Sequence, residues 1–136
     1  MHEADARVLL LKVPRSRDDV PLQVGQRRPL ERGAAGKVIL AYRGERGASY
    51  DEIRRRGFEH TLGEVNTSIA SVAAAVCCGR TVLGSVCISA PATSPAAREL
   101  EAAAPAVMAA AQWISSALTN ARLPSPVRHA AATWHP

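Results

Sequence analysis

The chain has 136 residues, 47% of them hydrophobic, which predicts one folded domain and excludes two domains or a wholly disordered chain. Seventeen lysines and arginines against twelve acidic residues give a net charge of +5. Because the basic residues are scattered and aromatic residues make up only 4%, we interpret this charge as a solvated surface and not as a nucleic-acid site. A basic patch at residues 54–56 stays open as an alternative.

The N-terminal part of the chain predicts two strands and a helix. Apolar runs at 7–13 and, more weakly, at 22–26 are typical of strands. Residues 33–42 (GAAGKVILAY) have the apolar spacing of a helix, whose opening glycines allow another group to approach the backbone. The start of such a helix offers free N–H groups to an anion or a carboxylate. The segment is not a phosphate loop, because the four-residue spacer and the Ser or Thr after Lys37 are missing.

A second short helix and a connector follow. Ser49, with Glu52 three residues later, predicts a capping box, and Gly57 predicts the end of this helix. Residues 58–66 are expected to form an irregular connector.

Residues 68–90 predict a β-hairpin around which the domain is organised. Alternation places one apolar set of side chains on a single face, which a common core should bury: Val72, Ala74, Val76, Val82, Gly84, Val86 and Ile88. Val76 and Val82 share this face only if the loop has an odd number of residues, and a three-residue loop, 78–80, satisfies this. Gly79 or Arg80 is expected near the left-handed conformation.

The opposite face of the hairpin carries small, weakly polar side chains. They are Ser71, Ala73, Ala75 and Cys77 on the first strand, and Leu83, Ser85, Cys87 and Ser89 on the second. Such a surface leaves room for something other than side chains.

A long helix is predicted after the hairpin. Ser94 and Pro95 predict its start, Asn120 lies near its end, and Pro105 should kink or divide it. One apolar stripe runs along it: Leu100, Ala104, Val107, Ala111, Ile114 and Leu118. The remaining residues, 121–136, predict a disordered tail. The predicted class is α+β, with helices packed on a mostly antiparallel sheet.

Four segments together resemble one protein family. GAAGKVILA at 33–41, IRRRGFEHTLGEVNTSIASVAAAV at 53–76, GSVCISAP at 84–91 and VMAAAQWISSAL at 107–118 are similar, in order and spacing, to segments of IclR-type transcriptional regulators. The resemblance implies an effector-binding domain with a GAF-like fold at residues 1–120, N-terminally truncated. It also implies that DNA is bound only through a winged-helix domain not present in this chain.

The resemblance implies five ligand-binding residues. The backbone pair at the helix start falls on Ala34 and Ala35, and the pocket side chains fall on Ser71, Cys87 and Ser89. The last three lie on the face that alternation alone marks as small and polar.

The chain also departs from the family pattern at three places. The usual proline of the first hairpin strand is Ala75, the usual Phe-Asp is Cys77-Cys78, and an acidic pocket residue of some members falls near Thr61.

Other kinds of site were weighed against this interpretation. Cys77 and Cys78 point to opposite faces, which favours buried free thiols over a metal or redox cluster. His60 and Glu64 are interpreted as connector residues, although Glu64 matches the family's Gly-Glu and could bond backbone near the pocket. No G-x-S-x-G element accompanies the serines. We therefore expect no catalytic residue, no metal and no cofactor.

The sequence thus predicts a domain that binds a small organic acid or aromatic effector and acts through the geometry of a homodimer or tetramer. An odd cysteine count, without a signal peptide or long apolar run, predicts a cytoplasmic protein that does not enter a membrane. The alternatives are a small enzyme or metal-binding protein on the same sheet, or a non-functional truncated remnant. The sequence does not name the effector, the target genes or the direction of regulation.

Overall fold

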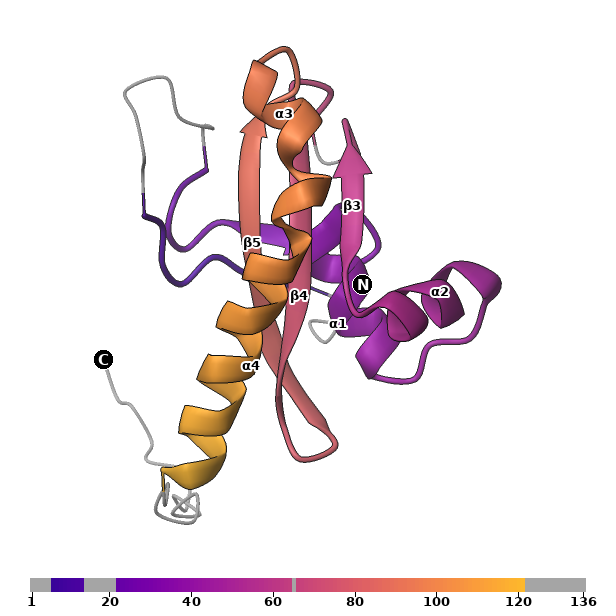
Figure 1. The fold of residues 1–136 in the computed structure, drawn as a ribbon, viewed down its shortest axis with the longest axis vertical. Helices are drawn as coiled ribbons and strands as arrows, with labels where there is room; N and C mark the ends of the chain where they lie inside the picture. The colour runs from indigo at the N-terminus through magenta and orange to yellow at the C-terminus, as the bar shows by residue number, and fades with distance from the viewer. Residues whose placement is uncertain (1–5, 14–21, 65, 122–136) are drawn as a thin grey trace, which may run out of the picture.

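The computed structural model describes residues 6–13, 22–64 and 66–121, and these residues form the predicted α+β architecture (Figure 1). The elements in chain order are β1 (Ala6–Val8), β2 (Arg27–Pro29), α1 (Ala34–Tyr42), α2 (Ala48–Arg56), β3 (Glu59–Leu62), β4 (Ile69–Cys78), β5 (Thr81–Pro91), α3 (Pro95–Glu99), a 3-10 turn (Glu101–Ala103) and α4 (Ala104–Asn120). A two-stranded ribbon, β1–β2, and a three-stranded sheet, β3–β4–β5, are both antiparallel. The predicted disordered tail falls almost wholly on residues 122–136, outside the described residues.

Most of the β4–β5 hairpin has the predicted face pairing. Two residues depart from it: Val82 lies opposite Cys77 and not opposite Val76, and Ile88 is 42% exposed instead of buried. Ala74 lies opposite Val86 and Val76 opposite Gly84, so these apolar residues share one face. We call this the α4 face, because α4 covers it, and we call the face with Ser71, Ala73 and Ala75 the α1 face.

The predicted three-residue loop is wrong. Cys78 pairs with Thr81, which leaves a turn of two residues, Gly79 and Arg80. With a two-residue turn, Val76 and Gly84 lie opposite each other only because the register shifts by one residue between Val76 and Cys77. A bulge and an odd loop have the same effect on parity, so alternation alone does not distinguish them. Gly79 is left-handed (φ 59°), as predicted.

The α4 face holds the larger apolar core. The helix divides near Pro105, as predicted, into α3, the 3-10 turn and α4. Four residues of the predicted stripe are buried in this core, and two partly buried ones pack against it: Leu100, Ala104, Val107 and Ala111, with Ile114 and Leu118. They pack against Ala70, Val72, Ala74 and Val76 of β4.

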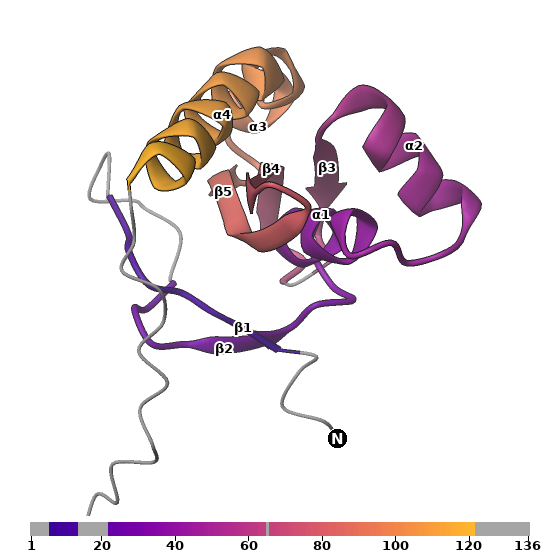
Figure 2. The same ribbon diagram turned by 90° about the horizontal axis from the view of Figure 1, so that it is seen from below.

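A smaller core lies on the α1 face. Helices α1 and α2 contribute Ala34, Val38, Ala41 and Ile53, which pack against Ala73 of β4. Figure 2 shows α4 on one side of the sheet and α1 with the β1–β2 ribbon on the other. The predicted small face is therefore covered in part by α1.

The two N-terminal strands differ from their predicted positions. β1 is Ala6–Val8 and overlaps the predicted 7–13 only at residues 7 and 8, and β2 is Arg27–Pro29 and not 22–26. The apolar side chains that suggested longer strands, Leu10 and Leu11, are exposed. Apolar runs were therefore a poor guide to a ribbon that contributes little to either core.

Two further local predictions are wrong. Helix α2 is capped by Gly47 without a side-chain hydrogen bond, and Glu52 binds Arg55, so no capping box forms at Ser49. The predicted connector at 58–66 contains strand β3, which pairs with β4. The end of α2 at Gly57, in the left-handed conformation (φ 87°), is confirmed.

Candidate functional site

Three of the five predicted ligand-binding residues lie together on the α1 face. Ser71 in β4 is directly opposite Ser89 in β5, and their hydroxyl oxygens are 2.8 Å apart. The Cys87 thiol lies 3.6 Å from the Ser89 hydroxyl. Alternation in two adjacent strands produces this cluster, because every second side chain of a strand emerges on the same side.

The start of α1 already has hydrogen-bond partners. The backbone N–H of Ala34 donates to Thr61 Oγ1 (3.1 Å), and that of Gly33 donates to Glu64 Oε2 (3.1 Å). Glu64 also forms an ion pair with Lys37 (2.5 Å). An acceptor on a ligand would have to replace Thr61 at the Ala34 amide. The predicted contact of Glu64 with nearby backbone is present, and the ligand-binding role of Ala34 and Ala35 stays a prediction.

Two arginines that the sequence analysis did not single out lie beside this cluster. Arg7 and Arg28 are directly opposite each other in the β1–β2 ribbon, and we call them the arginine pair. Arg7 Nη1 donates to the carbonyl oxygens of Pro29 and of Arg32, the latter at 2.9 Å. Arg28 Nε is buried and has no hydrogen-bond partner. The only signal in the sequence was the apolar run at 7–13, and such a run does not reveal the register of two three-residue strands.

The thiol and the arginine pair affect each other electrostatically. Burial raises the pKa of Cys87, while hydrogen bonds from Ser89 and Ser71 and the charge of Arg7 oppose this rise. Burial also lowers the pKa of Arg7, helped by the charge of Arg28 and opposed by Cys87. The Cys87 side chain is nevertheless solvent-exposed, so we expect the net effect on its thiol to be small.

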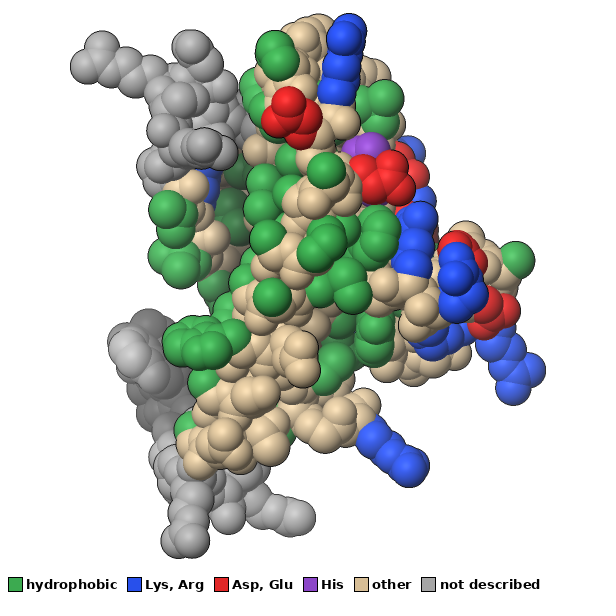
Figure 3. All heavy atoms as spheres, in the orientation of Figure 1, with side chains coloured by type: hydrophobic (Ala, Val, Ile, Leu, Met, Phe, Trp, Pro, Cys, Tyr) green, Lys and Arg blue, Asp and Glu red, His purple; other side chains and the backbone are tan. Residues whose placement is uncertain are grey.

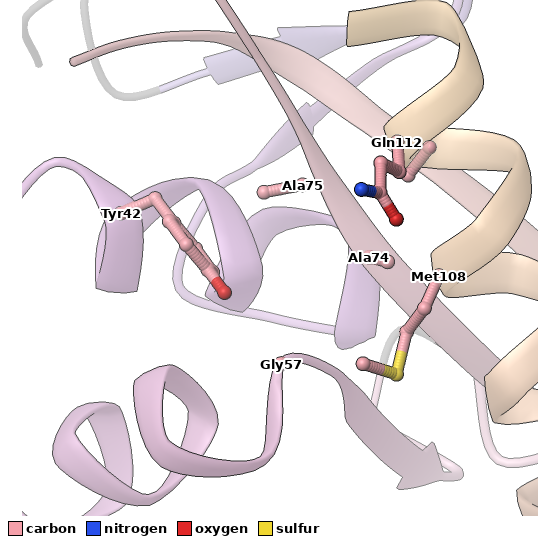
Figure 4. Close-up of a pocket in the computed structure, with 7 residues that line it drawn as sticks. Tyr42, Gly57, Ala74, Ala75, Met108 and Gln112 are labelled. Atoms are coloured by element: carbon pink, nitrogen blue, oxygen red, sulfur yellow. The ribbon is translucent and has the colours of Figure 1, made fainter. Parts of the chain in front are cut away.

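Among the hollows elsewhere in the described part of the chain, we consider two, and none of the five predicted residues lines either of them. One, of about 200 Å³, lies between the end of α1, β4 and α4. Figure 4 shows Tyr42, Met108 and Gln112 converging on it. It is small for a ligand site, since drug-sized pockets begin near about 300 Å³. The other, of about 490 Å³, is lined by Leu30, Glu31, Leu40, Glu45 and Tyr50.

The structure does not bring His60 and Glu64 together as a pair. His60 lies opposite Val72 on the α4 face, whereas Glu64 binds the start of α1. No group of three or more His, Cys, Asp or Glu residues among the described ones is placed to hold a metal ion. None of the described helices has the length and apolar character that crossing a membrane requires.

The possible basic patch at 54–56 is neutralised by nearby carboxylates. Arg54 pairs with Asp51, Arg55 with Glu52, and Arg56 with the buried Glu59. Figure 3 shows positive and negative side chains intermixed over the region of α2, apart from the hydrophobic side chains along α4. An alternating arrangement of this kind is typical of a solvated helix.

The fold is that of the C-terminal domains of IclR-type transcriptional regulators, as the four sequence segments predicted. A putative transcriptional regulator from Rhodococcus sp. RHA1 superposes with a TM-score of 0.73 at 22% identity, covering 87% of this chain and 58% of that one. A putative IclR-family regulator from Rhodococcus sp. gives 0.70 at 18% identity, covering 85% and 54%. The C-terminal domain of KdgR from E. coli gives 0.60 at 21% identity, covering 71% and 74%.

These likenesses concern the fold. No protein-family model matches the sequence, and no curated protein matches it significantly. The chain spans less than two thirds of the two Rhodococcus regulators it resembles.

Proposed function

We propose that this chain is a ligand-sensing domain of a transcriptional regulator and that it binds a small organic acid or aromatic metabolite on the α1 face. The observation that carries this proposal is the cluster of Ser71, Cys87 and Ser89, with the two hydroxyls 2.8 Å apart. Two hydroxyls and a thiol on a wall of small side chains can orient a ligand without supplying a reactive base. The fold shared with regulator domains supports the same assignment.

Regulation follows by population shift. An effector that binds one arrangement of two associated domains more tightly favours that arrangement and so repositions the winged-helix domains that contact DNA. Association as a homodimer or tetramer, and contact with DNA through another domain, are parts of this proposal.

The test compares the two faces of the hairpin. Ser89→Leu fills space on the α1 face and should abolish effector binding with little loss of stability. Ser89→Ala removes one neutral hydrogen bond of about 0.5–1.5 kcal/mol and should weaken binding only several-fold. Val86, which packs against the core of the α4 face, is the matched control. Val86→Ala should cost roughly 0.5–3 kcal/mol of stability and spare binding.

Thermal melts paired with titration of an effector, found by screening metabolites, provide both measurements. If Ser89→Leu unfolds the domain while Val86→Ala abolishes binding, the ligand face has been assigned to the wrong side.

A further inference from the structure

The arginine pair is an unusual arrangement for a short ribbon. Arg7 and Arg28 are register partners, so their side chains leave the same side of β1 and β2. Like charges directly opposite each other destabilise a strand pair. Arg28 Nε is also buried without an acceptor, and such an unsatisfied charged donor has a desolvation cost. An anion between the two side chains would reduce the repulsion between the two charges and would give Arg28 Nε an acceptor.

The pair is positioned at the proposed effector site. A Cβ built on Gly36 of α1 would lie 2.6 Å from Arg7 Nη1, which places this guanidinium against the first turn of the helix. The charge of Arg7 also acts on the thiol of Cys87 in β5. Figure 2 shows the β1–β2 ribbon on the same side of the sheet as α1. Arg7 therefore lies close to the start of α1 and within electrostatic reach of Cys87, with Arg28 beside it in the ribbon.

Two carboxylates on this side of the described part of the chain already have other partners. Glu64 accepts from Gly33 and pairs with Lys37. Glu59, which lies opposite Ala73 on the α1 face, is bonded by Arg56. Neither of these two carboxylates forms an ion pair that would neutralise the charge of the arginine pair.

We propose that Arg7 and Arg28 bind the carboxylate of the effector between their guanidinium groups, while Ser71, Cys87 and Ser89 contact the rest of the ligand. The planar fork of a guanidinium matches a carboxylate, and the resulting charge-assisted hydrogen bonds are stronger than neutral ones. Arg28 Nε is the donor left for such a contact, because Arg7 also holds the Pro29 and Arg32 carbonyls. This inference rests on the proposed function and narrows its ligand class to organic acids.

The experiment uses matched acids and amides with the 136-residue chain. Acetate, succinate and benzoate are titrated against acetamide, succinamide and benzamide, with binding followed by NMR chemical shifts. Arg28→Gln is compared with Arg27→Gln, a control with the same charge change at the exposed neighbouring position. We expect at least one acid to bind about tenfold more tightly than its amide, because one charge-assisted bond contributes that much. Arg28→Gln should remove this preference, and Arg27→Gln should preserve it.

A second measurement separates ligand binding from a structural role of Arg28. Without ligand, Arg28→Gln should melt at or above the wild-type temperature, because it removes a like-charge contact and a buried unpaired donor. A lower melting temperature, together with unchanged acid binding, would make Arg28 structural and overturn the inference.

The outcomes also separate this inference from the proposed function. If acid and amide bind equally and Ser89→Leu abolishes both, the arginine assignment fails and the effector site stands. If no acid of the panel binds at millimolar concentration, the inference is overturned, and a screen of neutral metabolites decides the proposed function by itself.

Discussion

The two faces of the β3–β5 sheet carry different kinds of side chains from the same strands. On the α4 face, β4 contributes Ala70, Val72, Ala74 and Val76, and a 17-residue helix covers them with apolar side chains. On the α1 face, a nine-residue helix covers Ala73 and its neighbours, while hydroxyl, thiol and guanidinium groups lie at the margin. The comparison teaches that alternation lets one hairpin hold the core on one side and present polar groups on the other.

The largest expected effect is on the α4 face. Leu100 is 4% exposed, and Leu100→Ala should lower the free energy of unfolding by about 2–5 kcal/mol through lost burial and a cavity. Leu83 is 53% exposed, so Leu83→Ala is the matched control and should change stability by about 0.5 kcal/mol or less. Urea denaturation measures both. Equal losses would mean that the core is not concentrated under α4.

Next in size is the close approach at Gly36. A Cβ there would lie 2.2 Å from the carbonyl oxygen of Leu30, so Gly36→Ala must push α1 away from the backbone after β2. We expect a loss of about 1–3 kcal/mol, as for other overpacking substitutions. At Gly84 a Cβ would meet no atom within 4 Å, so Gly84→Ala should be nearly neutral. Equal melting temperatures for the two variants would contradict this close packing.

A smaller effect is expected at the hydroxyl that holds the start of α1. Thr61 is 7% exposed and accepts a hydrogen bond from the Ala34 N–H. Thr61→Val keeps the shape but leaves that buried donor unpaired, which should cost about 1–2 kcal/mol in chemical denaturation. Thr119→Val, at an exposed position of α4, is the control and should change little. A neutral Thr61→Val would mean that the Ala34 amide is free to find another acceptor.

The smallest effect concerns pH. Burial raises the pKa of Cys87, and also that of Cys77. The native state therefore keeps these protons in a range where the unfolded chain loses them, and stability is lost as the pH rises above about 8.5. Because the Cys87 side chain is solvent-exposed, we expect only a small fall in melting temperature between neutral pH and about pH 10, and a smaller one in Cys87→Ser. An increase in stability over this interval would reverse the sign of the prediction.

Local sequence patterns predicted the α4 side of the fold because the elements that pack there are close together in the sequence. Alternation predicted that Ser71 and Ser89 share a face, and helical spacing predicted the stripe that includes Val107. Strand β3 was missed because its sequence, EHTL, is polar at an edge position where packing with β4 and an Arg56–Glu59 pair replaces apolar alternation. Propensity does not detect such a strand.

The arginine part of the candidate site could not have been predicted. Arg7 and Arg28 meet only through the register of two three-residue strands, and no side-chain pattern in so short a segment fixes a register. The occupied amide of Ala34 was equally hidden, since its partner Thr61 comes from a strand that the sequence did not reveal. Both depend on contacts distant in sequence.

The core on the α4 face is formed by one continuous part of the chain, and this affects the order in which parts of the domain unfold. All its members lie between residues 58 and 118, whereas the core on the α1 face joins residues 34–53 to Ala73. The hairpin and α4 can therefore stay packed while α1 detaches. Backbone amides of α1 should then exchange with solvent through a partial opening that requires less free energy than global unfolding. A ligand that contacts α1, the ribbon and β5 would suppress this partial opening. Its binding would then appear as slower amide exchange in α1, with the protection of α4 nearly unchanged.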